Sequence, residues 1–373
     1  MITVNKITTR DGLEGLKPVW NSLLAESAAN CVTLTWEWLT TWWDVFGADR
    51  ELNILVASDG REIIGIAPLL KRTVQHYGLL PFRRLELLAS GEDEADEICS
   101  DYLDFIIRNG REGETVHALL DYLFKTDSDW DEILLTDMAA ESRSLPALKK
   151  LCEATGTKCE VMRDQIGTYL SLPADWDELV GGLSQNFRRK IQKDRRTLAA
   201  NGGSLQITDS REGFDEAFDA LVRLHQQRWT SRGEPGVFAS EKFTRFHRTV
   251  APKLLDKGWL QLFIVNFGGE PVSALYAFTY NGKMYYYQGG FSEAKSALAS
   301  PGTLVQSYAV ETAIKMGLSE YDFLKGGESG YKTKWGGQTR SIIQIRLAQP
   351  DSKEVLYSTT TRVLDGLRSI KRA

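Results

Sequence analysis

The sequence has 373 residues, a formal net charge of −5, and a composition that is 42% apolar and 25% charged. These values exclude fibrous and disordered classes of protein and leave room for two compact domains. The acidic balance argues against a general nucleic-acid binder, whose electrostatic footprint is a basic excess.

The cysteines and the N-terminal residues indicate the cellular compartment in which the protein is expected. Cys31, Cys99, Cys152 and Cys159 form no CxxC pair and no metal-type cluster with histidine, so we expect reduced thiols and no metal site. Residues 1–10 alternate like a strand and lack the apolar core of a signal peptide. Because no run of about 18 apolar residues occurs, we expect a cytoplasmic protein without a transmembrane segment.

A β-hairpin pattern occurs twice along the chain. Residues 52–56 form an apolar strand before a turn at 58–60, and residues 260–264 repeat that strand before a turn at 268–270. A second apolar strand follows each turn. The second copy then turns again at Asn281-Gly282, so three antiparallel strands follow one another there.

The order of elements downstream also recurs. Segment 130–135 matches segment 318–323, and each follows a helix-like stretch. This plan predicts an α/β fold with two tandem domains, each a mixed, largely antiparallel sheet flanked by helices. We place the first domain at 1–164, the second at 165–350, and a helical extension at 351–373.

The segment Ser300-Pro301-Gly302-Thr303 is typical of a helix start that faces an anion. Ser300 suits the N-cap, Pro301 suits the first helical position, and Gly302 permits close approach of a ligand to the backbone. The first amide groups of such a helix can bind phosphate. An exposed helix dipole contributes only about 0.3–1 kcal/mol, so basic side chains must help. The available lysines are Lys295, Lys325 and Lys332. A well-capped structural helix is the alternative.

A stretch dense in glycine and charge, residues 326–337, follows the next predicted strand. Such a stretch indicates ligand contact or special backbone angles, and a tight turn at the solvent edge is the alternative, which we favour for Lys334. Glu328 and Tyr331 are better functional candidates, because they follow the carboxyl end of a strand. Asp322, on that strand, is expected to orient or cap.

Two upstream helices carry polar candidates. The segment 186–198 is apolar on one side and basic on the other, and Arg188 belongs to its basic side. It could hold coenzyme phosphates, an anionic acceptor or RNA, although a solvated face is the alternative and the aromatic residues of RNA binders are missing. His225 and Arg228, with Trp229, end the next helix. No Ser/His/Asp or Cys/His set can be assembled, which argues against a hydrolase.

Together these residues resemble the CelD-like, Fem-related acyltransferases of the GNAT superfamily. The resemblance spans most of the chain, including 36–47 and 100–104, and is best over 167–347. The residues that support it are Arg188 to Leu198, His225, Arg228, Trp229, Gln288-Gly289, Ser300-Pro301-Gly302, Tyr321-Asp322-Phe323, Glu328, Tyr331-Lys332 and Trp335. It implies a duplicated GNAT fold, acetyl-CoA or another acyl-CoA as donor, and an association with bacterial polysaccharide or envelope synthesis. The sequence departs from typical GNAT enzymes because it lacks an obvious Gln/Arg-x-x-Gly-x-Gly/Ala loop.

The expected reaction is direct attack of an acceptor amine or hydroxyl on the thioester, without a covalent enzyme intermediate. We expect catalytic roles for Glu328 as base, Tyr287 as acid or wall, and Asp322. Donor binding is assigned to Ser300, Pro301, Gly302, Thr303, Lys325 and Lys332. Substrate binding is assigned to Arg188, His225, Arg228, Trp229, Gln288, Tyr331 and Trp335.

Two rival functions remain open at this point. One is aminoacyl transfer from charged tRNA, as Fem-type enzymes perform, and the other is a non-catalytic scaffold among polysaccharide-synthesis proteins. The acidic run 92–97 would repel a pyrophosphate, so the first domain is expected to be structural or to face the acceptor. The C-terminal segment 361–373 is expected to dock on its own protein. The sequence leaves the acceptor and the oligomeric state open.

Overall fold

The computed structural model describes residues 1–293, 298–326 and 330–372. Contacts between residues divide the chain into two compact units. Unit 1 comprises Met1–Gly91, Ser100–Asp164 and Ile342–Ala373, and unit 2 comprises Glu92–Cys99 and Gln165–Ser341. Each unit is therefore built from separate stretches of sequence, and the predicted boundaries at 164 and 350 remain a proposal about domains.

Unit 1 holds a mixed sheet with the strand order β1-β2-β3-β4-β6-β13. Only β4 and β6 are parallel within this order, and the other pairs are antiparallel. Its elements are β1 (Ile2–Ile7), α1 (Arg10–Glu14), α2 (Lys17–Ala25), α3 (Trp36–Phe46), β2 (Glu51–Asp59), β3 (Glu62–His76), β4 (Leu80–Leu87), β5 (Ile106–Ile107), α4 (Glu112–Lys125), β6 (Glu132–Ala139), α5 (Leu145–Thr155), the start of β7 (Lys158–Ser171), most of β13 (Gln338–Ala348) and α11 (Ser352–Arg372).

The strands of unit 2 follow the order β7-β12-β11-β10-β9-β8 and are also mixed in direction. Here β11 and β12 are the parallel pair. Its elements are the end of β7, α6 (Trp176–Gly182), α7 (Gln185–Ala200), β8 (Ser204–Thr208), α8 (Phe214–Thr230), α9 (Glu241–Leu255), β9 (Leu260–Phe267), β10 (Glu270–Tyr280), β11 (Lys283–Phe291), α10 (Pro301–Lys315) and β12 (Glu320–Lys325). Short 3₁₀ turns complete the chain: η1 (Val32–Leu34), η2 (Gly47–Asp49), η3 (Glu94–Asp96), η4 (Val237–Ala239) and η5 (Thr333–Trp335).

Both units follow the predicted plan of antiparallel strands, a helix and a parallel strand, so the predicted fold class is confirmed. The turn between β10 and β11 illustrates why. Asn281 and Gly282 both have positive φ, at 47° and 72°, which is the conformation that a two-residue hairpin turn requires. Local turn chemistry therefore sets this register.

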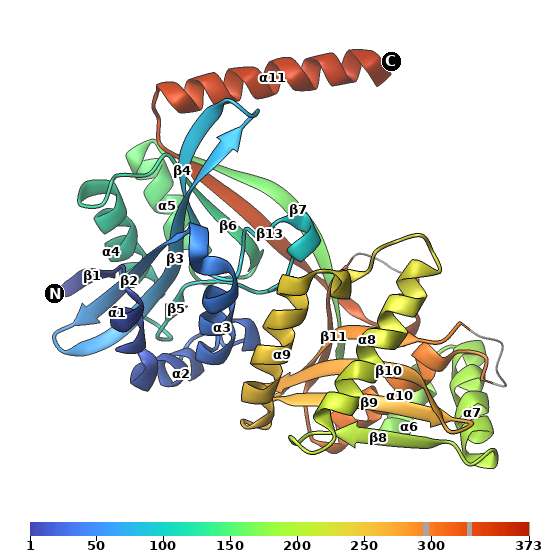
Figure 1. Cartoon of the computed structure of the whole chain (residues 1–373). Coiled ribbons are helices and arrows are strands. Elements are labelled where there is room, and N and C mark those ends of the chain that lie inside the picture. Colours follow the sequence, from blue (N-terminus) through green and yellow to red (C-terminus); the bar gives the residue numbers. More distant parts are fainter. Residues whose placement is uncertain (294–297, 327–329, 373) are drawn as a thin grey trace. The chain divides into compact units, whose positions relative to one another are not determined.

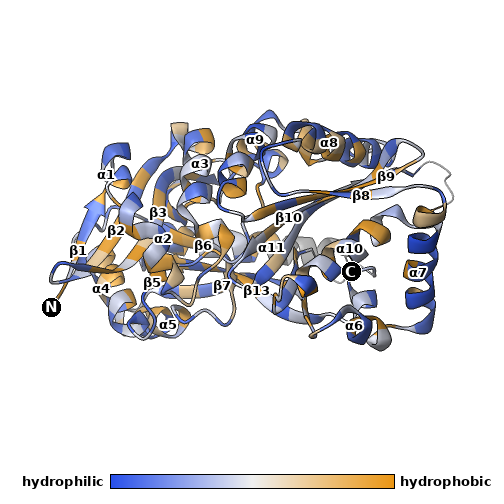
Figure 2. Cartoon of the chain, turned by 90° about the horizontal axis from the view of Figure 1, so that it is seen from below, coloured by the Kyte–Doolittle hydropathy of each residue, from blue (hydrophilic) through white to orange (hydrophobic). Residues whose placement is uncertain are grey.

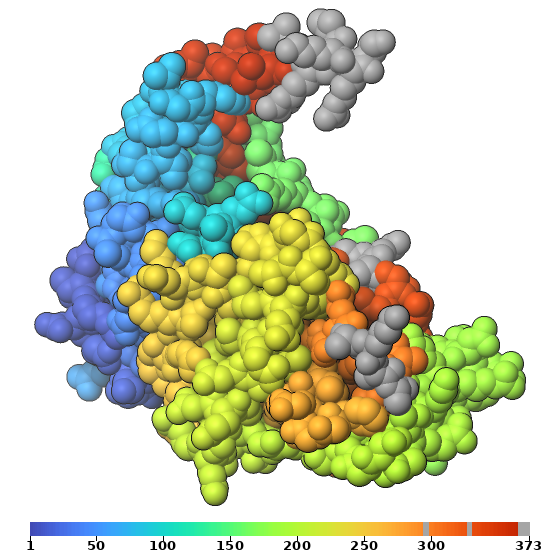
Figure 3. Space-filling view, turned by 45° about the vertical axis from the view of Figure 1, so that its right-hand side comes forward, coloured from blue at the N-terminus to red at the C-terminus, as the bar shows by residue number. Residues whose placement is uncertain are grey.

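Helices cover both faces of the unit 2 sheet (Figures 1 and 2). Alternate residues of β10 point to opposite sides, because a strand has a side-chain period of two. Leu275 and Ala277 pack with α7 and α10 in one apolar core. Tyr276 contacts Phe218 of α8 and His247 of α9 on the other face. Figure 3 views the α8–α9 face, coloured yellow-green to yellow.

Helix α11 belongs to unit 1 and is anchored there by charge. Glu354 lies 2.6 Å from Arg346 and 3.0 Å from Lys158. Tyr357 stacks on Tyr77 at the tip of the β3–β4 hairpin, with ring centroids 5.8 Å apart. These contacts anchor the first turns of α11, and the docking predicted for segment 361–373 stays a prediction. Among the described helices, none is long and apolar enough to cross a membrane.

Candidate functional site

The two parallel strands of unit 2 are paired over a short distance. Their register runs from Lys283 opposite Glu320 to Tyr285 opposite Asp322. Beyond it β12 is irregular, because Leu324 has a φ of 58°. The Asp322 carboxylate accepts a hydrogen bond of 2.7 Å from the Leu324 amide and stabilises this uncommon conformation. The register of the two strands thus ends at Tyr285 and Asp322, before either strand reaches its carboxyl end, which is where open α/β sheets collect ligands.

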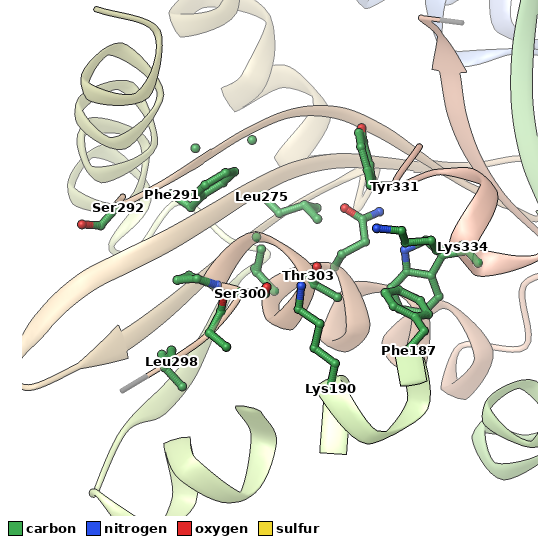
Figure 4. A pocket seen from close by; sticks show the side chains of 18 of the residues that line it. Phe187, Lys190, Leu275, Phe291, Ser292, Leu298, Ser300, Thr303, Tyr331 and Lys334 are labelled. Atoms are coloured by element: carbon green, nitrogen blue, oxygen red, sulfur yellow. Dashed lines mark hydrogen bonds between the residues drawn. The ribbon is translucent and has the colours of Figure 1, made fainter. Parts of the chain in front are cut away.

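A cavity of about 570 Å³ lies at this place, entirely within unit 2. It is bordered by the end of β11, the start of α10, the first turns of α7, the end of α8 and the segment around η5. Its volume falls in the range of about 300–1,000 Å³ that is typical of small-molecule sites. Figure 4 shows the side chains that converge on it.

The start of α10 opens into this cavity, as predicted. Ser300, Pro301, Gly302 and Thr303 all line it. Ser300 occupies the N-cap, but its hydroxyl donates to the Ala299 carbonyl at 2.7 Å instead of capping the helix. Within the described chain, the amides of Gly302 and Thr303 therefore have no hydrogen-bond partner. Such amides form an anion-binding site.

Two neighbours hold this helix start in position. The buried Asp194 carboxylate of α7 accepts a hydrogen bond of 3.0 Å from the Ala299 amide. A Cβ atom on Gly302 would lie 2.8 Å from the Phe291 ring. The ring of Phe291 thus fills the space that a side chain at Gly302 would need, and close approach of a ligand to the Gly302 backbone stays a prediction.

The cations beside the helix start differ from those expected. Lys190 of α7 and Lys334 line the cavity, and Figure 4 shows both side chains directed toward the region of Thr303. Lys332 is buried, and its ammonium donates to the carbonyls of Phe323 at 3.0 Å and Leu324 at 3.2 Å.

Neither of the other predicted lysines adds to this set. Lys325 lies 3.6 Å from Glu97 and does not line the cavity. Lys295 lies outside the described residues. Lys334, which the sequence assigned to the solvent edge, lines the cavity instead, and Lys190 was considered only as part of the basic segment 186–198. Its spacing of three residues from Phe187 could have placed it on the same side of α7 as that cavity residue.

Aromatic residues form one wall. Trp335 is 2% exposed and meets Phe187 edge to face, with ring centroids 5.1 Å apart. Tyr331 is 41% exposed and also lines the cavity. The structure therefore brings the predicted residues Tyr331 and Trp335 to the same cavity as Ser300 to Thr303.

A tyrosine adjacent to the predicted one faces the cavity. Tyr286 lines it, and its hydroxyl interacts with that of Tyr331. Burial raises the pKa of Tyr286, so this phenol keeps its proton at neutral pH. Tyr287 lies on the opposite face of β11, where its hydroxyl donates to the Ile98 carbonyl and lies 3.0 Å from His247 Nε2. Strand alternation, had the register been known, would have separated the two.

Of the candidates from α8, Arg228 lines the cavity. His225 is 1% exposed, and its Nδ1 lies 3.1 Å from the Gln226 side-chain oxygen. Burial lowers the pKa of His225 to about 4, so the imidazole is neutral, and its side chain is also hydrogen-bonded to Gln288. His225, Gln288, Trp229 and Arg188 do not line the cavity.

Acidic groups are scarce at the cavity. Glu293 is the one carboxylate among the described lining residues, and it pairs with Arg232 at 2.6 Å and Ser231 at 3.1 Å. The hydrogen bond from Arg232 lowers the pKa of Glu293, which makes it a weak base. The predicted base, Glu328, lies outside the described residues. In the same described part of the chain, no three His, Cys, Asp or Glu side chains gather as metal ligands.

Residues 185–333 match a family model described as an acetyltransferase (GNAT) domain. The chain contains a GNAT-type domain. The match begins with α7 and ends at η5, so it spans almost every element that borders the cavity. The GNAT part of the resemblance is thereby confirmed, whereas the CelD-like part stays a proposal.

Solved structures with low identity share the fold over nearly the whole chain. FemX is 14% identical with a TM-score of 0.64, and the match covers 95% of this chain and 99% of FemX. L-PGS from Bacillus licheniformis is 11% identical with a TM-score of 0.53, covering 92% and 96%. The C-terminal domain of a putative lysylphosphatidylglycerol synthetase from Agrobacterium fabrum is 6% identical with a TM-score of 0.52, covering 93% and 96%. No curated protein matches the sequence.

Proposed function

We propose that the protein is a cytoplasmic acyltransferase that uses acetyl-CoA or another acyl-CoA as donor. The acceptor is an amine or hydroxyl of an amino sugar, an amino acid or a polysaccharide precursor. One observation carries this proposal: the start of α10 presents free amides to a cavity that Lys190 and Lys334 also line. The match of 185–333 to a GNAT domain supports the same reaction class.

The residues present fit the diphosphate of such a donor. The amides of Gly302 and Thr303 would hold its oxygens, and the two lysines would balance its charge. Hydrogen bonds to a charged group are worth about 1.5–3 kcal/mol each, which is more than the helix dipole alone supplies. The donor supplies an activated thioester carbonyl.

The chain's own residues position the two reactants and donate a hydrogen bond to the leaving group. Orientation of two reactants in one cavity supplies much of the rate in a direct transfer. The protonated hydroxyl of Tyr286, with Tyr331 beside it, is suited to donate a hydrogen bond to the departing sulfur. Tyr286 therefore takes the role first assigned to Tyr287. We keep Glu328 as the proposed base, and Asp322 positions the end of β12.

A thermal-shift titration with a panel of acyl-CoAs tests donor use. A ligand at 100-fold over its dissociation constant stabilises the folded protein by about 2.7 kcal/mol. The double variant Lys190→Met/Lys334→Met should need on the order of 100-fold more acyl-CoA, because it loses two charge-assisted contacts. Lys193→Met is the matched control, since Lys193 is exposed on the same helix and does not line the cavity. A wild-type protein that no acyl-CoA stabilises would sink the proposal.

The proposed base is tested by kinetics. Glu328→Gln should lower the acyl-transfer rate by about 100- to 10,000-fold, the range for loss of a general base. The residual rate should lose its dependence on pH over the range in which the carboxylate titrates. Equal rates for wild type and variant at every pH would remove Glu328 from the mechanism.

A second candidate is aminoacyl transfer from charged tRNA. The exposed basic side of α7 favours it, because Arg189, Lys193 and Arg196 are exposed on the helix that borders the cavity. Figure 2 shows the largely hydrophilic colouring of α7. The full-length similarity to FemX is compatible with it. Filter binding to charged tRNA at physiological salt distinguishes the two. Saturable binding that Lys193→Met and Arg196→Met weaken, with no response to acyl-CoA, would favour the tRNA reaction. The absence of a response to acyl-CoA and of binding to charged tRNA would favour a scaffold among polysaccharide-synthesis proteins.

A further inference from the structure

Arg228 is fixed in the cavity wall by packing. It stands near the end of α8, where a Cβ atom on Gly290 would lie 2.3 Å from the His225 backbone nitrogen. The helix is thus pressed against β11. The guanidinium carbon of Arg228 lies 4.4 Å from the centroid of the Phe291 ring. Phe291 in turn fills the space beside Gly302. The charge is therefore held in place by an aromatic surface.

This guanidinium has hydrogen-bonding capacity to spare. Within the described residues it makes no hydrogen bond and no ion pair, and its Nε atom is buried without a partner. The nearby carboxylate of Glu293 is engaged by Arg232. Arginine presents five N–H donors in a planar fork that matches carboxylate and phosphate groups. A fixed cation with unused donors in a cavity wall is suited to an anionic ligand.

The face of the sheet from which Arg228 comes indicates which anionic ligand it binds. The proposed donor cations belong to α7 and to the segment after β12, on the side of α10. Arg228 comes from α8, which packs on the other face through contacts such as Phe218 with Tyr276. An acceptor must approach a thioester from a side that the donor leaves free. The α8 side meets that requirement.

We propose that Arg228 binds an anionic oxyacid group, a carboxylate or a phosphate ester, of the acceptor. That the bound molecule is the acceptor rests on the proposed function. Anion binding by Arg228 can be measured without a donor. In the acyl-transfer reaction the acceptor's nucleophilic atom bonds to the carbonyl carbon, the carbon–sulfur bond breaks, and the proton of the nucleophile passes to a base. Arg228 takes no part in those bonds.

Calorimetric titration with matched probes tests the proposal. Glucosamine is compared with muramic acid, which adds a carboxylate, and with glucosamine 6-phosphate. Lysinamide is compared with lysine in the same way. Wild type should bind at least one probe that carries a carboxylate or phosphate about tenfold or more tightly than the partner that lacks this group, as a charge-assisted pair allows. Arg228→Met should abolish that preference, and Arg228→Lys should keep part of it, because it retains charge but loses the fork.

Arg223→Met is the control, since Arg223 is exposed on the same helix and does not line the cavity. It should keep the full preference. Equal binding by wild type of the probes with and without the carboxylate or phosphate, or a preference that survives in Arg228→Met, overturns the proposal. Loss of coenzyme A binding in Arg228→Met, to the extent seen in Lys190→Met, also overturns it, because Arg228 would then serve the donor. If wild type binds anionic probes through Arg228 but no coenzyme A, the acyl-CoA function fails and the anion site stands.

Discussion

The strand–helix–strand region of unit 1 and that of unit 2 share a plan but differ in charge. In unit 1, β4 and β6 form three parallel pairs, and in unit 2, β11 and β12 do the same. A residue with positive φ follows in both, Asp137 at 56° and Leu324 at 58°. The intervening helices are α4 and α10.

The first turns of these helices separate the two regions. Helix α4 begins Glu112-Gly113-Glu114, whereas α10 begins Pro301-Gly302-Thr303. Carboxylates at a helix N-terminus stabilise the helix and repel an anionic ligand, while a neutral first turn leaves the dipole free for one. The difference teaches that a duplicated backbone can keep its topology while a few side chains decide which copy can bind an anion.

The largest effect should come from close packing between helix and strand. Gly290→Ala would place a Cβ atom 2.3 Å from a backbone nitrogen and 2.6 Å from a backbone carbon of α8, which cannot move alone. We expect a loss of about 3 kcal/mol or more in the free energy of unfolding, measured by urea denaturation. Gly65→Ala in unit 1 is the counterpart. Its Cβ atom would meet side chains only, Thr115 at 2.4 Å and Ile107 at 3.5 Å, and the change should cost less. The reverse order would contradict this account of the packing.

The two units should respond to pH in opposite directions. Burial raises the pKa of Asp104 in unit 1 to about 6, so its stabilising effect is present below pH 4 and is lost as the pH rises toward 6. Burial lowers the pKa of His225 in unit 2 to about 4, so its effect is present above pH 6.5 and is lost as the pH falls toward 4. Each amounts to at most about 3 kcal/mol.

Denaturation curves measured between pH 4 and pH 6.5 test the direction in which each group changes the free energy of unfolding. Relative to wild type, Asp104→Asn should gain stability as the pH rises, and His225→Gln should gain stability as the pH falls. The Asp104 side chain accepts a hydrogen bond of 2.7 Å from the Phe105 amide, which asparagine can retain. Parallel curves for wild type and either variant would mean that the group does not titrate in this range.

Exchanging the charge of the helix starts should affect binding more than stability. Thr303→Glu gives α10 the acid that α4 has at the same helical position. We expect acyl-CoA binding to weaken by at least about tenfold through charge repulsion, while helix stability stays equal or rises slightly. The matched variant Glu114→Thr should leave ligand binding unchanged. Calorimetry with acetyl-CoA decides, and undiminished affinity in Thr303→Glu would place the donor elsewhere.

The smallest effect concerns the acidic run 92–97. Asp96 accepts a hydrogen bond of 2.6 Å from Ser240, the N-cap of α9, and lies 3.3 Å from Lys242. Asp96→Asn should cost at most about 1 kcal/mol, because the pair is partly exposed. Amide hydrogen exchange should quicken in α9 and leave unit 1 unchanged. Faster exchange in β3 or β4 instead would assign the acidic run to unit 1.

The fold could be predicted where its signals are local. The turn at Asn281-Gly282 and the helix start at Ser300 depend on residues that are neighbours in sequence, and both are confirmed. The repeated strand patterns likewise identified the duplicated α/β plan, since alternation and turn chemistry act over a few residues.

The site could be predicted in part. Which lysine meets the cavity depends on how η5 turns the chain, so Lys332 became buried under strand carbonyls while Lys334, two positions later, reached the cavity. The choice between Tyr286 and Tyr287 depends on which face of the sheet α10 covers, because Tyr286 is paired with Ala277, which packs in the same core as α10. Neither feature is encoded in a local pattern.

The acidic run shows the same limit over a longer range. The sequence suggested that residues 92–97 would repel a phosphate within the first domain. In the structure this run belongs to unit 2, where Lys325 and Lys242 balance Glu97 and Asp96. Partners more than a hundred residues away cannot be read from composition.

The pairing of β13 with β6 has a consequence for biosynthesis. Residues Ile342 to Ala348 complete the unit 1 sheet, although a ribosome makes them after all of unit 2. Until they emerge, β6 has an open edge, and the buried Glu132 lacks its partner Arg346. A nascent chain halted before Ile342 should therefore hold unit 1 in an unfinished, protease-sensitive state, so that the earliest segment to be translated is among the last to mature.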